Sequence, residues 1–418
     1  MPSRVPTSNN YISTIEKTVL PNGVRVLSEF VPTVESFALG VWVDVGSRDE
    51  TPDTVGIAHF IEHLAFRRTA KRSSRSIAAE FESLGAYTNA FTAKEQTCFY
   101  VRALKPHFRK TLSLLAEITL QPALHPADIE KERTVIIEEI KSYDDEPEEV
   151  IFDCGEKSLF AHHPLGNPIA GTVETVGAIT PDAIRSFHTH RYNTSNIIIA
   201  VSGNIEHSLA VKIAMQYFSY LPNAEPIKRT TPEIPPPERI VINKQFQQGH
   251  LLLSKRIPGV RSADRYCFSV LNTLLGDGMS SRLYQRIRER SGLAYSVYSS
   301  IQMMSDCGAI MLYAATDEKK VAKTEAMIYE ELTKLCEAKI SPKELSRAQE
   351  QSKSSIIMSL ESMSSRMQTM GKSELEEGFH ESIAATIERV EAVTADDILR
   401  LSQEYLRADG WSVAEIRG

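Results

Sequence analysis

The same order of strand-like and helix-like segments occurs twice along this chain of 418 residues, once on each side of a proline-rich segment. Five prolines lie between Pro226 and Pro237, a density that excludes regular structure and indicates a linker. We therefore predict an α+β protein of two related domains, each an antiparallel-rich β-sheet with helices packed on one face. The expected boundaries are residues 1–225 for the first domain, 226–238 for the linker and 239–418 for the second domain.

Hydrophobic periodicity predicts the individual strands and helices. In the first half, strands are predicted at 23–30, 37–47 and 192–205, a strand hairpin at 87–104, and helices at 56–69, 76–85 and 126–143. In the second half, a strand is predicted at 249–259, a buried helix at 265–276, a helix leading into a strand at 281–300, and a long helix at 317–338. An offset of 207 residues aligns Ser74, Arg75, Glu82 and Gly85 with Ser281, Arg282, Glu289 and Gly292. These identities agree with the repeated order of elements.

Composition excludes several classes of function. The net charge of −7 and the lack of a Lys/Arg-rich run argue against nucleic acid as a partner. Five cysteines without a CxxC pair predict neither a disulfide framework nor a thiolate zinc site, and they fit a reducing compartment. The hydrophobic runs are too short to span a membrane. We expect a cytoplasmic location, with the mitochondrial matrix as the alternative because no acidic residue precedes Glu16.

The predicted helix at 56–69 is apolar nearly all the way round, yet it contains His59, Glu62 and His63. Burying an ionised carboxylate is costly unless an opposite charge compensates it. Successive helical residues turn by about 100°, so the two histidines point in nearly the same direction, with Glu62 beside them. Two imidazoles one turn apart can reach one cation, and a catalytic zinc site needs a third N or O ligand. The aligned positions in the second half, Tyr266, Ser269 and Val270, lack these polar groups.

The long helix at 126–143 offers the missing ligand. Glu132, Val135 and Glu139 share one face, flanked by isoleucines, so acids point inward from a second mostly buried helix. Packed together, the two helices would bring His59, His63 and Glu139 to one metal ion, with Glu132 near enough for a supporting hydrogen bond. The alternative is a helix with two hydrogen-bonded core histidines, but it leaves the buried acids without compensation.

Several motifs together resemble one known family. The motifs are HFIEHLAF, NAFTAKEQT, ERTVIIEEI with Glu139 lying 76 positions after His63, HPLGNPIAGT, YNTSNIIIAVSGNIEH and GDGMSSRLYQRIRERSGLAYSVYS. They span nearly the whole chain. The sequence resembles the inverted-motif zinc peptidases of the M16 clan, which includes pitrilysin, insulin-degrading enzyme and mitochondrial processing peptidase, and most resembles its short bacterial, processing-peptidase-like type.

The resemblance implies a role for each matching residue. His59, His63 and Glu139 would bind one Zn²⁺ per chain, Glu62 would be the general base and Glu132 a supporting acid. Arg288 and Tyr295, seven residues apart, match the pair that holds substrate and stabilises the tetrahedral oxyanion. The mechanism implied is zinc-dependent peptide hydrolysis, in which Glu62 takes a proton from the attacking water and passes it to the leaving amine.

The resemblance also implies how substrate binds. Asn89, Ala90, Phe91 and Thr92 would form an edge strand to which an extended peptide pairs. Glu149 and Asp153 lie where the processing peptidases receive a basic substrate residue. A solvated acidic turn is an equally good interpretation of these two residues.

Short members of the family act as dimers that enclose a chamber, so a homodimer is expected, with a heterodimer of homologous subunits as the alternative. The rival to an active zinc endopeptidase is a non-catalytic or partner-dependent subunit, similar to a processing-peptidase partner or a respiratory-complex core protein. Such subunits typically lack part of the metal set, and this chain keeps all of it. The physiological substrate stays open.

Overall fold

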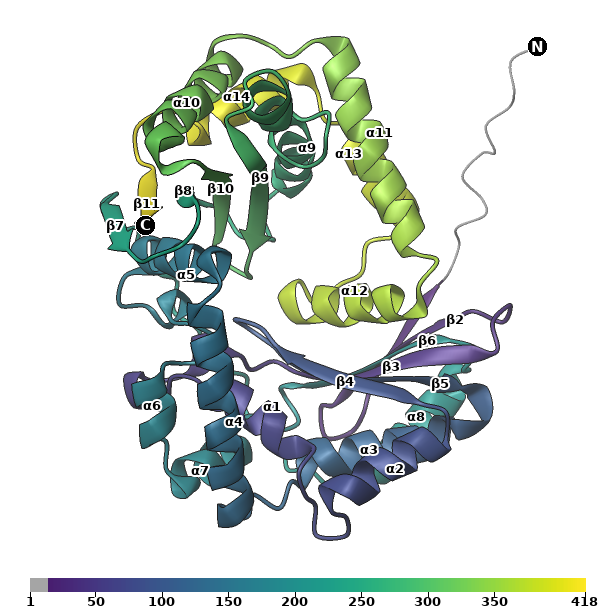
Figure 1. Ribbon diagram of the computed structural model, residues 1–418. Helices are drawn as coiled ribbons and strands as arrows, with labels where there is room; N and C mark the ends of the chain where they lie inside the picture. Colours follow the sequence, from purple (N-terminus) through teal and green to yellow (C-terminus); the bar gives the residue numbers. More distant parts are fainter. Residues whose placement is uncertain (1–13) are drawn as a thin grey trace, which may run out of the picture. The chain divides into compact units, whose positions relative to one another are not determined.

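The computed structural model describes residues 14–418 and divides the chain into two compact units (Figure 1). Unit 1 contains the described residues up to Lys141 together with Asn167–Thr230 and Ser359–His380; unit 2 contains Ser142–Gly166, Thr231–Met358 and Glu381–Gly418. The N-terminal residues that suggested a mitochondrial location lie almost entirely outside the described range. None of the helices within residues 14–418 has the length and apolar character needed to cross a membrane.

Unit 1 is built on a six-stranded sheet with the order β1-β2-β6-β3-β5-β4. Its strands are β1 Ile15–Val19, β2 Arg25–Phe30, β3 Ser36–Val43, β4 Tyr87–Thr92, β5 Thr97–Leu104 and β6 Ile197–Gly203. Only the β2–β6 pair is parallel, and the other neighbours are antiparallel. The predicted hairpin forms as β4 and β5, which leaves β4 at the edge of the sheet.

Successive side chains of β3 point alternately to the two faces of this sheet. Phe37, Leu39 and Val41 enter the larger core, which also contains residues of α1 (Ile57–Ala65), α3 (Phe108–Leu120) and α8 (His207–Phe218). Ala38 and Trp42 point to the opposite face, where they pack with residues of α12 (Met363–Glu376). Figure 1 shows α12 on the side of the sheet opposite to α2, α3 and α8.

Unit 2 contains a five-stranded sheet with the order β7-β11-β8-β10-β9. Its strands are β7 Arg239–Asn243, β8 Gly249–Ile257, β9 Ala294–Met303, β10 Gly308–Thr316 and β11 Ser412–Arg417. Leu251 and Leu253 of β8 face a core shared with α9 (Arg265–Leu275), α10 (Val321–Glu337) and α14 (Ala395–Tyr405). Leu252 faces the other side, where α5 (Pro147–Phe160) packs.

The repeated architecture predicted from the sequence is confirmed. The order β2-β6-β3-β5-β4 in unit 1 corresponds to β7-β11-β8-β10-β9 in unit 2, and both begin with the parallel pair. The remaining helices are α2 Ser74–Ser83, α4 Pro126–Asp144, α6 Val173–Ala178, α7 Pro181–Arg191, α11 Pro342–Ser359 and α13 Ile383–Glu391. Residues 226–238 contain neither helix nor strand, as the prolines predicted. None of the five cysteines forms a disulfide.

Two details differ from the sequence-based expectation. The boundaries at residues 225 and 239 do not describe the compact units, because α5 belongs to unit 2 and α12 to unit 1. Helices had been expected on one face of each sheet only. In the structure, each sheet also carries a helix on its second face. The reason is that both strand faces are apolar at the sheet centre, so the second face must also be covered.

Candidate metal centre

The helix α1 carries His59, Glu62 and His63 on its least buried side. Six of its nine residues are fully buried. His59 and His63 are half-buried, with 12% and 22% of their side chains exposed. Although the helix is apolar nearly all the way round, both histidine side chains therefore keep some contact with solvent.

The start of α1 is held by a buried carboxylate. Glu50 accepts hydrogen bonds from the backbone N–H groups of Gly56 (2.8 Å) and Ala58 (2.9 Å). Gly56 has φ +95°, and a Cβ there would lie 2.7 Å from the carbonyl oxygen of Ala170, so only glycine fits. Burial raises the pKa of Glu50 to about 8, against the opposing effect of its two backbone hydrogen bonds. This cap fixes the position of the helix that carries both histidines.

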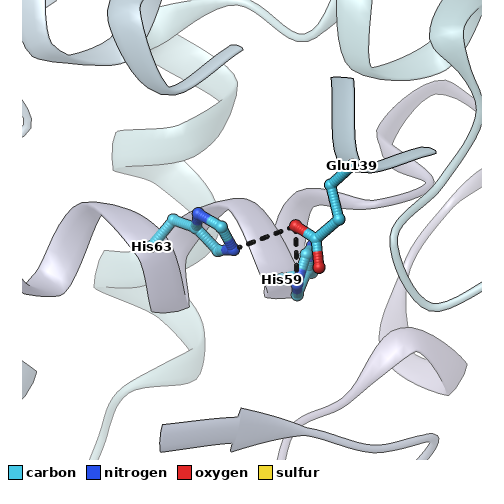
Figure 2. A group of neighbouring side chains, drawn as sticks. All are labelled: His59, His63 and Glu139. Carbon is cyan, nitrogen blue, oxygen red and sulfur yellow. Dashed lines mark ion pairs between the residues drawn. The ribbon is translucent and has the colours of Figure 1, made fainter. Parts of the chain in front are cut away.

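Two helices bring His59, His63 and Glu139 together, as Figure 2 shows. The Nε2 atom of His63 lies 3.5 Å from Oε2 of Glu139, and Nε2 of His59 lies 4.0 Å from the same oxygen. Burial and the neighbouring His63 lower the pKa of His59 to about 4, so this imidazole is neutral at pH 7. Neutral imidazole is the form that binds a metal ion.

His59, His63 and Glu139, the ligand trio, fit a zinc ion. All three candidate ligand atoms lie within 4.8 Å of one another. Zinc bonds to N and O ligands of about 2.0–2.2 Å require ligand atoms no more than about 4.4 Å apart, so small side-chain rotations suffice. The donor set of two imidazoles and one carboxylate is typical of a catalytic zinc site, which keeps a further position open. Among the residues described, this is the one group with such a geometry.

Glu132 supports the trio from α4. Its Oε2 lies 3.1 Å from Nδ1 of His63, and its carboxylate also forms an ion pair with Arg67. A proton on Nδ1 of His63 leaves Nε2 as the ligand atom. The sequence predicted a supporting hydrogen bond from Glu132 without naming its partner, and it did not predict the ion pair with Arg67. By contrast, Nδ1 of His59 is buried and has no hydrogen-bond partner within the part of the chain that the structure describes.

Glu62 lies beside the histidines and is bound by Thr92 of β4. The Thr92 hydroxyl donates a hydrogen bond of 2.6 Å to Oε2 of Glu62. Its other oxygen, Oε1, has no hydrogen-bond partner among residues 14–418. Burial raises the pKa of Glu62 above its usual range, and the bond from Thr92 acts in the opposite direction.

The predicted substrate strand is an edge strand, as expected. β4 pairs with β5 on one side only. Phe91 packs edge-to-face on Trp42 with ring centroids 5.6 Å apart, while Ala90 faces the larger core, so the strand is fixed by its side chains. The Ala90 N–H donates to the side-chain oxygen of Asn89 (2.9 Å), and a peptide pairing there would have to compete with that bond.

Arg288 and Tyr295 lie in unit 2 and contact each other. The guanidinium of Arg288 is 4.8 Å from the centroid of the Tyr295 ring and 5.0 Å from that of Tyr284. Arg288 therefore makes cation–π contacts with two aromatic rings. Tyr295 is 74% exposed at the start of β9, so its hydroxyl is available to a ligand.

Glu149 and Asp153 lie on α5 in unit 2, one helical turn apart and both exposed. They are part of a helix and do not form the acidic turn that the sequence also allowed. They belong to a different compact unit from the trio.

Sequence reasoning missed three residues of these surroundings: Glu50, Arg67 and Tyr284. The first two offered no local signal, because neither the cap across six residues nor the ion pair to another helix follows from spacing. Tyr284 precedes Arg288 by four residues on the predicted helix, and this spacing could have indicated the contact.

The fold and the group of His59, His63 and Glu139 together define a class: repeat proteins of two α+β units in which the first unit carries a His-His-Glu group that could hold a metal ion. Residues 25–173 match the family described as insulinase (peptidase family M16), and residues 178–352 match the family described as peptidase M16 inactive domain. The chain belongs to peptidase family M16. The second match covers most of the second half of the chain, in which the positions aligned with His59, Glu62 and His63 carry other residues.

Curated relatives extend over nearly the whole chain. An uncharacterized zinc protease of Mycobacterium bovis is 37% identical over 97% of this chain and 94% of its own length. An uncharacterized zinc protease of Bacillus subtilis is 36% identical over 94% of this chain and 96% of its own length. These names support a metallopeptidase.

Solved structures agree on the fold. A protease from Helicobacter pylori aligns with a TM-score of 0.92 and 22% identity, covering 98% of this chain and 100% of that one. A peptidase M16 inactive domain from Pseudomonas fluorescens aligns with a TM-score of 0.90 and 21% identity over 96% and 98% of the two chains. At this level of identity the likeness concerns the fold alone.

Proposed function

We propose that this chain is a zinc-dependent endopeptidase that binds one Zn²⁺ through His59, His63 and Glu139. The observation that carries the proposal is that these three ligand groups meet beside Glu62. Zinc, when bound, polarises the scissile carbonyl and lowers the pKa of water towards neutrality. The rest of the chemistry falls to side chains of the chain itself.

Glu62 is the general base in this proposal. Its Oε1 accepts a proton from the attacking water while Thr92 holds Oε2, and the carboxyl group then gives the proton to the leaving amine nitrogen. The raised pKa of Glu62 suits both steps, because the group can hold the proton between them. Arg288 and Tyr295 would donate hydrogen bonds to the carbonyl oxygen as negative charge develops there.

An extended peptide or unfolded polypeptide would bind as an added strand along Asn89, Ala90, Phe91 and Thr92. The open side of β4 and its direct link to Glu62 support this position. We further propose that Glu149 and Asp153 favour basic substrate residues, and that the active form is a dimer enclosing a chamber, as in short members of the family. A homodimer is the simplest form, and a heterodimer with a homologous subunit is the alternative.

The test is zinc content and polypeptide cleavage of the purified full chain. Dialysis against a chelator should abolish both, and added zinc should restore both. Glu139→Gln should lose zinc, whereas Glu138→Gln, its exposed neighbour on α4, should keep it. Glu62→Gln should retain zinc and lose about 10² to 10⁴ in kcat. Full cleavage by metal-free protein would overturn the proposal, and bound zinc without turnover would favour a partner-dependent subunit.

A further inference from the structure

Unit 2 contains a second candidate site, far from any metal ligand in sequence. A cavity of about 650 Å³ lies between residues 280–290, α10 and α11. Its lining includes five cationic side chains: Arg282, Arg286, Arg290, Lys334 and Arg347. Only two carboxylates line it, Glu331 and Glu344. A basic cavity in a chain of net charge −7 is a local feature that the overall charge does not explain.

The two carboxylates are already neutralised. Arg282 pairs with Glu344 at 3.1 Å, and Lys334 pairs with Glu331 at 2.6 Å. Arg286 pairs with Glu330 at 2.9 Å, outside the lining. These ion pairs account for three of the five cations.

The remaining two cations have no carboxylate partner within the described range. Arg347 donates to the carbonyl oxygen of Ser280 at 3.1 Å, and the guanidinium of Arg290 has no side-chain partner. Each guanidinium carries five N–H donors, so most of their hydrogen-bonding capacity is directed at solvent or at a ligand. The cavity thus has two positive charges in excess.

One buried donor in the same lining is also unsatisfied. The hydroxyl of Ser281, on a residue that is 1% exposed, has no hydrogen-bond partner in the described structure. Nε of Arg286 has no hydrogen bond there either, but it lies 3.7 Å from Oε1 of Glu331 as an ion pair. Buried donors without partners are costly and rare in folded proteins. A ligand that carries several acceptor oxygens would satisfy the Ser281 hydroxyl and the free donors of Arg290 and Arg347.

We propose that this cavity binds an oxyanion of the phosphate type. A tetrahedral oxyanion presents acceptors in several directions, which suits donors that come from the 280–290 segment and from α11. A carboxylate has only two oxygens in one plane and would satisfy fewer of these donors. The volume lies within the range of small-molecule sites, so the phosphate can be one group of a larger compound. The inference does not depend on the proposed peptidase activity, because every group involved lies in unit 2.

Calorimetric titration of the full chain with inorganic phosphate tests the proposal, with sodium chloride at matched ionic strength in the reference and acetate as the carboxylate arm. Phosphate should bind with saturation, and acetate should bind more weakly. The double variant Arg290→Gln, Arg347→Gln should weaken phosphate binding at least about tenfold, since each lost bond involves a charged group. Ser281→Ala should weaken it about threefold to tenfold.

The matched control removes two cations elsewhere in unit 2. Lys339→Gln with Arg389→Gln changes the net charge equally, at exposed residues outside the cavity. Phosphate affinity should be unchanged in that control. The proposal is overturned if phosphate does not bind the wild type at tens of millimolar, if the double variant binds it equally well, or if both double variants lose affinity equally. Thermal unfolding of each variant confirms that it is folded before titration.

Discussion

The hydroxyl of Thr92 donates a 2.6 Å hydrogen bond to the carboxylate of Glu62. Thr92 ends the edge strand β4, and Glu62 lies on α1 between the two histidines. The strand proposed to bind substrate is therefore connected directly to the group proposed to move the proton.

The first prediction concerns this bond. Thr92→Val keeps the shape of the side chain and removes the donor, so kcat/KM should fall about tenfold, the size expected for a bond to a charged group. The bond from Thr92 lowers the pKa of Glu62, so its loss should move the acid limb of the pH–rate profile to higher pH. Thr92→Ser, which keeps the hydroxyl, should behave as the wild type. A valine variant with an unshifted profile would contradict the prediction.

Much of this arrangement could be predicted from the sequence because it depends on local periodicity. His59 and His63 share a helix face through their spacing of four residues, and β4 follows from the alternation in residues 87–92. The duplicated order of elements likewise predicted a sheet in each unit and the correspondence of α1 with α9, although the strands β1, β7, β10 and β11 were not predicted.

The rest depends on contacts that no local pattern encodes. The placement of α5 in unit 2 and α12 in unit 1 is decided by the apolar second face of each sheet. The bond from Thr92 to Glu62 joins residues 30 positions apart. This bond depends on how the helix is positioned along the strand, and hydrophobic periodicity does not determine that position.

The second prediction concerns Glu132, which contacts His63 and pairs with Arg67. Glu132→Gln keeps an acceptor for the imidazole but loses the charge that orients it, so zinc affinity should fall about 10- to 100-fold. Asp128→Asn is the matched control, since Asp128 on the same helix pairs with Arg68 away from the trio. Competition with a chromogenic chelator measures both affinities, and equal values would remove Glu132 from the support of the site.

The third prediction concerns Glu149 and Asp153 on α5. Both are exposed, so they are expected to act on binding more than on the chemical step. The double variant Glu149→Gln, Asp153→Asn should raise KM for peptides with Arg or Lys near the scissile bond and leave kcat and neutral peptides unaffected. If basic and neutral peptides respond alike, the two acids are surface charges only.

The fourth prediction concerns the pH dependence of stability. Burial raises the pKa of Glu376 to about 7 from its usual value of 4.5, against a smaller opposing effect of Lys372. Between these values the folded chain holds a proton that the unfolded chain has released, so the free energy of unfolding falls as pH rises through this window. Glu376→Gln cannot ionise at this position. Its free energy of unfolding should therefore not show this decrease, which is on the order of 2 to 3 kcal/mol in the wild type.

Thermal unfolding at pH 5, 6, 7 and 8 measures this effect. The melting temperature of Glu376→Gln relative to wild type should increase from pH 5 to pH 7 and change little between pH 7 and pH 8. Glu361→Gln, at an exposed residue shortly before α12, should run parallel to the wild type at every pH. Parallel behaviour of Glu376→Gln would show that Glu376 is ionised in the folded chain at pH 5 to 8.

The last prediction concerns the proposed homodimer, in which unit 1 of one subunit would form a site with unit 2 of its partner. Chains with Glu62→Gln and chains with Arg288→Ala should each be nearly inactive alone. After random exchange, about half of the dimers are hybrids, and an isologous pairing gives each hybrid one site with both lesions and one with neither. Activity should then recover to about a quarter of the wild-type level. If both groups came from one chain, every site would keep a lesion and mixing would restore nothing, so exchange confirmed by mass spectrometry without recovery would rule out a shared site.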